Sequence, residues 1–331
     1  MQCNRNTSAA NIFILDWNDK MKVYCDFTHS EDESAVALGN FDGLHKGHQK
    51  VILQAAECAK RGLVPTVLTF SGNTCKNSPE KPCGEIITME QKINLLERMG
   101  IKQLYVLPFI SVKDMTAEEF VTSVLSGVCK AKETSCGFNF TFGRGGTAGS
   151  GALAELCARR GIESSVAGAV ISGGKPISST RIRRLIAEGR VGEAAELLGR
   201  PFCFVSPVVR GNRIGSSLGT PTANQKVPPE FVKPKYGVYA SRVYLNGKYY
   251  CGVTDIGLKP TVGSDRVLVE TWMPDYAGGD LYGKTIRTEI LKFLRPEKKF
   301  SGLGELKKQI LINAEQSRDF FKKHGAGILN Y

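Results

Sequence analysis

Hydrophobic positions between residues 35 and 170 form two alternating kinds of segment. Short apolar runs, which are typical of buried strands, lie at 35–39, 63–70, 104–109 and 164–170. Segments with a helical period lie at 46–62, 88–100, 116–125 and 151–161. Thr116, with Glu119 three residues later, fits a capping box at the start of one of these helices. Strands that alternate with helices predict a parallel sheet with both faces covered.

The chain after residue 181 has a different pattern, in which two short helices precede a series of strands. The helices are expected within 181–202, with an interruption near Gly189 and an end at Gly199. Strand-like runs follow at 202–209, 237–246, 248–257, 267–273 and 285–294. Asn246 and Gly247 form a strong hairpin signal between two of these runs. Such strands predict an antiparallel barrel, and the periodic tail at 303–323 predicts a final helix.

This change of pattern divides the 331 residues into two predicted domains, 1–199 and 200–331. The second is the more basic, because from Pro201 onward 20 Lys and Arg face 11 Asp and Glu, which is +9 of the chain's net +12. A basic domain attracts anions such as nucleotide phosphates, nucleic acid or acidic lipid, and charge alone does not choose among them.

The composition indicates a cytoplasmic protein without a membrane contact. No apolar run approaches the length that a bilayer requires, and the first residues lack the order of a signal peptide. The ten cysteines are scattered, with no Cys-x-x-Cys pair and no histidine nearby at metal-ligand spacing. Reduced thiols are therefore expected in place of a disulfide framework.

The stretch LGNFDGLHKGHQKVI, which starts at residue 38, contains two of the four histidines of the chain. Its glycines let the backbone approach a ligand, and the helix that follows offers unpaired N–H groups to an anion. His45 and His48 can share one face of a turn, where positively charged donors would stabilise a reacting α-phosphate. The alternative is a tight turn with two structural histidines.

Two motifs favour the first of these interpretations. The stretch resembles the G-x-F-D-G-x-H-x-G-H signature of cytidylyltransferase-like nucleotidyltransferases, and ISSTRIR at 177–183 resembles their I-S-S-T-x-x-R motif. Physically, Ser179 and Thr180 can cap the next helix, and Arg183 is a fixed cation for phosphate. The resemblance implies catalytic roles for His45, His48 and Arg183. It also implies that ATP is bound by Gly39, Phe41, Asp42, Gly47, Ser179 and Thr180.

A second candidate site is RGNRIGSSLGTPTANQ at 210–225, which resembles the riboflavin kinase signature G-x-x-x-G-x-x-L-G-x-P-T-A-N. Its glycines let a loop wrap phosphates, and Thr222 and Asn224 offer the hard oxygen ligands that Mg²⁺ accepts. As a loop without function, the same string is ordinary turn chemistry. The resemblance implies Thr222 and Asn224 as metal ligands. It implies ATP binding by Gly211, Gly215, Gly219, Pro221 and Thr222.

The kinase reaction also needs a base, because the 5′-hydroxyl of riboflavin loses a proton as it attacks the γ-phosphate. VLVETWMPDYAGGDLYGKTIR at 267–287 resembles the family segment V-E-T-H-x-x-D-F-x-x-D-L-Y-G, whose glutamate is the proposed base. That residue is Glu270 here, and Trp272 stands where histidine is common. Arg287 follows at the end of this segment and is expected to contact the flavin or a phosphate.

The flavin side of the first site departs from the family. GFNFTFGRGG at 137–146 resembles the G-x-D-F-x-F-G-x-G-R segment of bacterial FAD synthetases, where FMN and ATP meet. This likeness implies flavin binding by Asn139 and Phe142. Asn139 replaces a usual aspartate, Gly146 a usual arginine and Ser150 a usual acid, and a Pro-His-Pro expected after Phe70 is missing.

From about residue 35 to 321 the chain resembles the prokaryotic bifunctional riboflavin kinase/FAD synthetase family. The resemblance implies an α/β Rossmann-like nucleotidyltransferase domain, followed by an antiparallel β-barrel riboflavin-kinase domain with a C-terminal helix. It implies phosphorylation of riboflavin to FMN by ATP, then adenylylation of FMN to FAD with release of pyrophosphate. The substrates would be riboflavin, FMN and ATP, the cofactor Mg²⁺, and nucleic acid is not an expected partner.

Three alternatives stay open. One is a working kinase whose adenylyltransferase half is slow or lost, because of the departures on the flavin side. Another is a basic nucleic-acid-binding barrel, which the +9 half and the tyrosines at 236, 239, 249 and 250 would support. The last is a flavin-responsive regulator built on the same scaffold. The sequence leaves the oligomeric state open.

Overall fold

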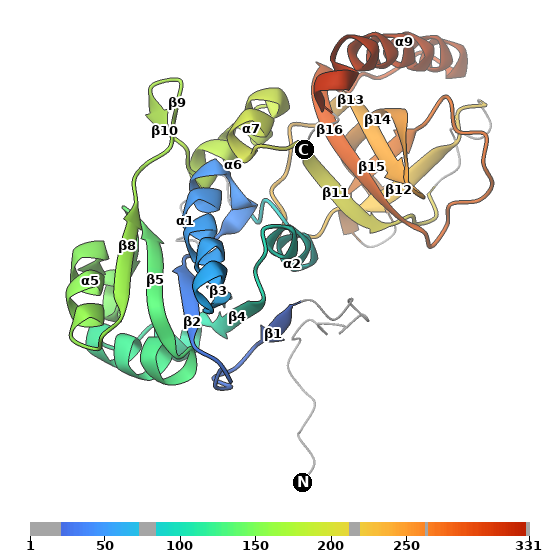
Figure 1. The fold of residues 1–331 in the computed structure, drawn as a ribbon. Helices are drawn as coiled ribbons and strands as arrows, with labels where there is room; N and C mark the ends of the chain where they lie inside the picture. The colour runs from blue at the N-terminus through green and yellow to red at the C-terminus, as the bar shows by residue number, and fades with distance from the viewer. Residues whose placement is uncertain (1–20, 73–83, 212–218, 262–263, 329–331) are drawn as a thin grey trace.

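The computed structural model describes residues 21–72, 84–211, 219–261 and 264–328. Figure 1 shows two groups of elements, one around a parallel sheet and the other around an antiparallel sheet. The helix α2 (Met89–Arg98) lies between the two groups. This is the predicted order of architectures along the chain.

The first sheet has six strands, and every neighbouring pair is parallel. In spatial order the strands are β1 (Lys22–Tyr24), β4 (Gln103–Pro108), β3 (Val64–Ser71), β2 (Ser34–Leu38), β5 (Ala131–Gly137) and β8 (Glu163–Ala167). All five residues of β2 are buried, because it lies between β3 and β5 with helices over both faces. This burial explains its unbroken apolar sequence.

Alternate residues of β2 belong to two hydrophobic cores, one on each face of the sheet. Ala35 and Ala37 pack in a core with α1 (Lys46–Glu57) and α2. Val36 and Leu38 pack in a core with η3 (Phe120–Val128) and α5 (Ser150–Ala158). The remaining elements of this half are η1 (Asp42–Leu44), η2 (Cys58–Arg61), α3 (Phe109–Val112), α4 (Ala117–Glu119), η3 (Phe120–Val128), η4 (Arg144–Gly146), α5 (Ser150–Ala158) and the short strands β6 (Thr141–Phe142), β7 (Ala148–Gly149), β9 (Ile171–Ser172) and β10 (Lys175–Pro176). The predicted covering of both faces is confirmed.

Local signals placed the helices well. The capping box of Thr116 and Glu119 is formed, although the helix widens into the π-helical turns of η3 after Glu119. Helices α6 (Ser179–Ala187) and α7 (Val191–Leu198) are separated at Gly189 and end at Gly199, as expected. The expected cap of α6 was wrong: Ser178 accepts the hydrogen bond from the Arg181 amide. Ser178 has the extended backbone that an N-cap requires, whereas Ser179 is already helical.

The second sheet has six antiparallel strands and forms the expected barrel. In spatial order they are β11 (Phe202–Pro207), β16 (Thr285–Arg295), β13 (Gly237–Leu245), β14 (Lys248–Thr261), β15 (Ser264–Trp272) and β12 (Thr222–Lys226). The edges β11 and β12 close on each other, because the Val209 amide donates to the Asn224 carbonyl at 2.8 Å and Gln225 Nε2 donates to the Ser206 carbonyl at 3.1 Å. The predicted final helix, α9 (Leu303–Ile328), packs against β13 and β14 (Figure 1).

Two details of the barrel concern the sequence-based expectations. Asn246 and Gly247 have φ values of 50° and 79°, which is the left-handed pair that a two-residue hairpin needs. The segment from Thr222 to Lys226, which follows the glycines expected to wrap phosphates and contains the expected metal ligands, is the strand β12. Its partners on β15 hold it in the sheet, and this long-range pairing has no local signal.

A buried seam joins the two halves of the chain. Phe202, Phe204 and Phe231 from the barrel side pack in the same hydrophobic core as residues of the parallel sheet. The Glu85 amide donates to the Glu230 carbonyl at 2.7 Å, so that backbone also crosses the seam. The sequence-based division at residue 199 lies between α7 and β11, next to this seam.

Candidate active sites

The first site is a cavity of about 900 Å³ at the carboxyl ends of β2, β5 and β8. Ligands of open parallel sheets commonly bind at this edge. The cavity brings together most of the residues expected there, which are Phe41, His45, Gly47, His48, Asn139, Phe142, Ser179 and Thr180. Three others, Gly39, Asp42 and Arg183, do not line it.

His45 and His48 stack on each other, with ring centroids 3.5 Å apart. His45 is the N-cap of α1, and its Nδ1 accepts a hydrogen bond from the His48 amide at 3.2 Å. The Nδ1 atom of His48 is buried and has no hydrogen-bond partner among the described residues. The two rings therefore sit at the N-terminus of α1, where an anion would also meet unpaired N–H groups.

The electrostatics of the pair differ from the expected positive charge. Burial lowers the pKa of His45 to about 4, and burial together with the neighbouring cations lowers the pKa of His48 well below its usual value. Desolvation disfavours the charged imidazole, so both rings are neutral at pH 7 in this structure. A triphosphate entering the cavity would favour protonation again.

Asp42 and Arg183 form a buried ion pair behind the cavity. Arg183 Nη2 lies 2.5 Å from Asp42 Oδ2, and Arg183 Nε donates to the Gly84 carbonyl at 2.7 Å. The other carboxylate oxygen of Asp42 accepts from the Ile86 amide at 2.9 Å. In this structure the guanidinium expected to bind phosphate is therefore engaged with the carboxylate of the neighbouring motif.

The two nucleotidyltransferase motifs meet directly. Ser179 Oγ donates to the Asp42 carbonyl at 2.9 Å, which joins the ISSTRIR segment to the turn before α1. Lys92 of α2, which the sequence reasoning missed, donates to the Asn40 carbonyl at 3.1 Å and is buried. Lys92 belongs to no motif and lies in a helix with ordinary periodicity, so no local sequence pattern predicted a role for it.

The expected flavin side lies across the cavity. Phe142 is buried and stacks with Phe140, with ring centroids 5.7 Å apart. Gly146, which stands where the family has arginine, has a left-handed φ of 68° that favours glycine. The nearby Arg144 donates instead to the Asp114 carbonyl at 3.0 Å. Part of the segment that departs from Pro-His-Pro lies outside the described residues.

The second site is a row of polar residues on one face of the barrel. Asn224 on β12 is directly opposite Glu270 on β15, and Glu270 is directly opposite Asp255 on β14. Directly opposed residues of antiparallel strands have Cβ atoms about 5 Å apart on the same face. Thr222, two positions before Asn224, faces the same side and is opposite Trp272. The structure thus brings together Thr222, Asn224 and Glu270, and adds Asp255, which the sequence reasoning missed.

The surroundings of Asn224 fit a hard metal ion. Asn224 is 4% exposed, and its Oδ1 has no hydrogen-bond partner within the described part of the chain. A Cβ built on Gly211 would lie 2.6 Å from Asn224 Nδ2, so the start of the glycine-rich loop packs directly on this amide. Gly219, at the other end of the loop, has a φ of 77°, and Pro221 is exposed. Gly215 lies outside the described residues.

Oxygen donors at this row suit Mg²⁺, which commonly takes one or two protein groups and completes its shell with phosphates and water. Among the described residues, no three His, Cys, Asp or Glu side chains gather as a metal site. The donors available to an ion at the row are therefore the Thr222 hydroxyl and the Asn224 amide oxygen beside the carboxylates of Asp255 and Glu270.

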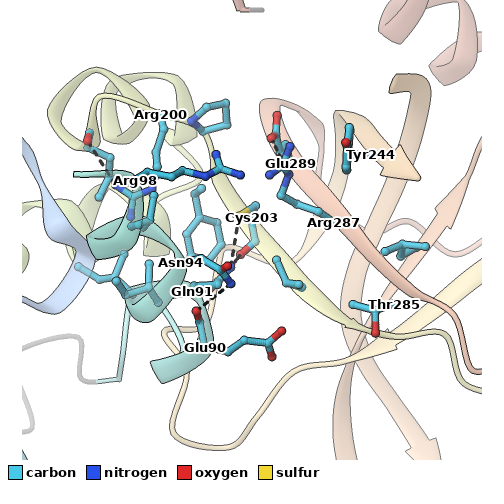
Figure 2. Close-up of a pocket in the computed structure, with 18 of the residues that line it drawn as sticks. Glu90, Gln91, Asn94, Arg98, Arg200, Cys203, Tyr244, Thr285, Arg287 and Glu289 are labelled. Carbon is cyan, nitrogen blue, oxygen red and sulfur yellow. Dashed lines mark hydrogen bonds and ion pairs between the residues drawn. The ribbon is translucent and has the colours of Figure 1, made fainter. Parts of the chain in front are cut away.

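Arg287, expected to contact flavin, is not brought to this row. Its Nη2 donates to Tyr249 Oη at 2.7 Å, and its Nε lies 3.1 Å from Glu289 Oε1. Tyr249 is six positions before Asp255 on β14, which is about 20 Å along a strand. Arg287 instead lines a pocket of about 330 Å³ between α2 and the barrel (Figure 2).

Three further observations bear on the alternatives. Tyr239, counted among the aromatic residues that would support nucleic-acid binding, is 0% exposed, because its side chain packs in the core. The seven cysteines in the described ranges are free thiols. Within those ranges, no helix combines the length and the apolar character needed to cross a membrane.

Two family models match the chain in succession. The model described as FAD synthetase matches residues 27–181, and the model described as riboflavin kinase matches residues 198–321. The first contains the histidine motif and the ISSTR part of the ISSTRIR segment, and it ends two residues before Arg183. The second contains the glycine-rich loop, the row on β12 and β15, and most of α9.

Known proteins match both parts together. The bifunctional riboflavin kinase/FMN adenylyltransferase of Listeria monocytogenes is 32% identical over 313 residues, which cover 93% of this chain and 95% of the relative. The Bacillus subtilis protein of the same name is 33% identical over 297 residues, which cover 87% and 93%. A crystal structure described as a macrolide-efflux protein from Streptococcus pneumoniae has a TM-score of 0.80 and 30% identity, and the match covers 90% of this chain and 98% of that one. With both family models and near-full-length relatives in agreement, the chain belongs to the bifunctional riboflavin kinase/FMN adenylyltransferase family.

Proposed function

We propose that the chain catalyses both reactions for which its relatives are named, one at each site. The second site transfers the γ-phosphoryl group of ATP to the 5′-hydroxyl of riboflavin and yields FMN and ADP. The first site transfers the adenylyl group of another ATP to FMN and yields FAD and pyrophosphate. The observation that carries this proposal is the row on β12 and β15, where Asn224 and Glu270 are directly opposed and Gly211 packs on the Asn224 amide.

At the second site, we assign the proton-accepting role to Glu270. Its carboxylate belongs to the same face as Asn224, so a hydroxyl held there is within reach of both. Thr222 and Asn224 would hold Mg²⁺ through oxygen atoms, and the bound ion would neutralise charge on the ATP phosphates. The choice of Mg²⁺ is part of the proposal and is supported by the hard donor set. Glycines such as Gly211 and Gly219 would let backbone N–H groups approach the phosphates.

At the first site, we assign phosphate binding to His45, His48 and the N-terminus of α1. These groups lie together at the cavity, and His48 has a buried ring nitrogen with no partner among the described residues. Negative charge grows on the α-phosphoryl oxygens and on the leaving pyrophosphate, and N–H donors stabilise it. We assign Asp42 and Arg183 an indirect role, because their ion pair holds the turn that leads into His45.

Each proposed reaction is assigned to one of the two predicted domains. We propose that residues 1–199 carry adenylyl transfer and residues 200–331 carry riboflavin phosphorylation. This division is supported by the two family models, which end and begin at residues 181 and 198. A cytoplasmic location belongs to the same proposal, since ATP is available there as co-substrate for both steps.

A product assay tests the proposal. The purified full chain is incubated with riboflavin, ATP and Mg²⁺, and the flavins are separated by chromatography. FMN is expected first and FAD afterwards, with pyrophosphate formed in step with FAD. Absence of FMN would overturn the kinase assignment, and failure to convert added FMN to FAD would overturn the adenylyltransferase assignment.

One observation favours a second candidate, a working kinase with a slow adenylyltransferase. Gly146 supplies no guanidinium where the family has one, and Arg144 is engaged with the Asp114 carbonyl. A flavin phosphate bound there would lack one positively charged donor. The same assay distinguishes the two, because FMN would then accumulate and FAD would form only slowly.

A further inference from the structure

The turn between β2 and α1 has an unfavourable backbone. Phe41 and Leu44 have left-handed φ values of 48° and 43°, and Gly43 between them has a φ of 80°. Residues with a Cβ rarely adopt this conformation, because the Cβ approaches the following carbonyl. Contacts from outside the turn must therefore hold it. The turn leads directly into His45, the N-cap of α1, so it decides where the histidine pair lies.

Arg200 supplies two of these contacts. Its Nη2 donates to the Gly43 carbonyl at 2.7 Å, and its Nη1 donates to the Leu44 carbonyl at 3.3 Å. A guanidinium is planar and has several donors in a fixed arrangement, so one side chain can bind two successive carbonyls. The two carbonyls are those immediately before His45.

Arg200 reaches the turn from the junction between α7 and β11. Its Nη1 also donates to the Leu198 carbonyl at 3.4 Å. Gln49 of α1 makes a matching bridge, since its Nε2 donates to the Leu44 carbonyl at 2.9 Å and to the Leu198 carbonyl at 3.0 Å. The junction between the two halves of the chain is thus fastened to the first turn of α1. Figure 2 shows Arg200 at the wall of the pocket between α2 and β16.

Arg200 is in direct contact with no carboxylate among the described residues, and Asp42 favours its positive charge only from a distance. Among the described residues, its hydrogen bonds go to backbone carbonyls and no ion pair is formed. Burial lowers the pKa of Arg200, and Cys203 and Asp42 offset part of this effect. The charge of Arg200 also opposes protonation of His45 and His48, so the guanidinium is electrostatically coupled to the site. A guanidinium in these surroundings needs hydrogen-bond partners, and the carbonyls of the turn supply them.

We propose that Arg200 is a positioning residue for adenylyl transfer, which holds the carbonyls of Gly43 and Leu44 and thereby fixes the histidine pair at the N-terminus of α1. It acts through the turn and does not touch the substrate. This inference rests on the proposed activity of the first site, which FAD formation by the unaltered chain tests separately. The sequence reasoning missed Arg200, because only the tertiary structure brings residue 200 to residues 43 and 44.

The experiment uses the second activity of the chain as an internal control for folding. Riboflavin phosphorylation and FMN adenylylation are measured on the same preparation of Arg200→Ala. The kcat for adenylylation is expected to fall about 10- to 100-fold, because a small misplacement of reacting groups has effects of this size. The KM for ATP should change much less, and the riboflavin kinase rate should stay unchanged. Arg200→Lys, which keeps the charge but has all its donors on one nitrogen, should recover part of the loss.

Arg98→Ala is the matched control, since it removes another guanidinium from the wall of the same pocket without touching the turn. It should leave both activities unchanged. The proposal is overturned if Arg200→Ala adenylylates FMN at the normal kcat, or if both activities and the melting temperature fall together. If Arg200→Ala does not fold, Arg200→Lys decides. A selective loss of adenylylation kcat in that variant supports positioning, and equal losses in both activities overturn it.

Discussion

Asn224 and Glu270 lie directly opposite each other in the pairing of β12 with β15. Their side chains share one face of the barrel, and Asp255 continues the same row on β14. A buried amide oxygen without a partner among the described residues therefore lies next to a carboxylate. This is the arrangement that a kinase needs, since one group can hold the metal ion and the next can accept the proton from the attacking hydroxyl.

Glu270→Gln should abolish riboflavin phosphorylation while sparing adenylylation. The amide keeps the shape of the side chain but does not accept the hydroxyl proton, so a loss of about a hundred- to ten-thousand-fold is expected. The rates of FMN formation from riboflavin and of FAD formation from added FMN are measured side by side. Glu315→Gln, an exposed position on α9, is the control. A normal kinase rate in Glu270→Gln would remove Glu270 from its proposed role.

Gly211→Ala should impair the kinase through Asn224. The added Cβ would lie 2.6 Å from Asn224 Nδ2, so either the amide or the loop must move. We expect the kinase rate to fall roughly ten- to a hundred-fold, with a higher Mg²⁺ concentration needed for half-maximal rate. Gly304→Ala is the control, because a Cβ there meets nothing within 4 Å. An unchanged Mg²⁺ dependence in Gly211→Ala would contradict the assigned metal site.

Stability should fall as the pH is lowered from about 6.5 to 4. Burial lowers the pKa of His45 to about 4 in the folded protein. Between these values the unfolded chain binds a proton that the folded protein does not. The free energy of unfolding therefore increases with pH in this window. The loss is on the order of 3 kcal/mol by pH 4.

His45→Asn isolates this effect from other titrating groups. Asparagine is also a good N-cap, so it keeps an acceptor for the His48 amide but does not titrate. Urea unfolding of both proteins at several pH values measures the difference. The variant should lose less stability than the unaltered chain on acidification, and parallel pH curves would show that His45 does not contribute.

Arg183→Met should destabilise the protein by about 3–5 kcal/mol. It leaves the buried carboxylate of Asp42 without its cation, and breaking one side of a buried ion pair has effects of this size. Denaturant unfolding measures the change. Lys22→Met breaks the exposed pair with Glu31, and there the loss should be less than about 1 kcal/mol. Adding Asp42→Asn to Arg183→Met should recover part of the stability, and no recovery would show that the pair is not coupled.

Much of the local structure followed from the sequence, because local interactions carry it. The apolar run at β2, the helical periods, the hairpin at Asn246 and Gly247, and the endings at Gly189 and Gly199 all depend on residues within a few positions of one another. The histidine motif before α1 could also be recognised in the sequence, because a candidate phosphate site at a helix N-terminus is built from one continuous segment. The cap of α6 was misassigned by one residue, since serines at 178 and 179 differ only in backbone conformation.

The parts of the fold and of the candidate sites that the sequence did not predict depend on contacts between distant segments. No local signal shows that Thr222–Lys226 is a strand, that Asp255 joins Glu270, or that Arg287 faces α2 instead of the row. Lys92 and Arg200 are single cations in ordinary surroundings until the fold brings them to the turn before α1. The sequence by itself determined most of the helices and strands and the two domain types, and it marked the candidate phosphate-binding segments, because these rest on short-range geometry and residue chemistry. Only the tertiary structure decided which side chains meet, because strand register and barrel closure are set by packing over the whole chain.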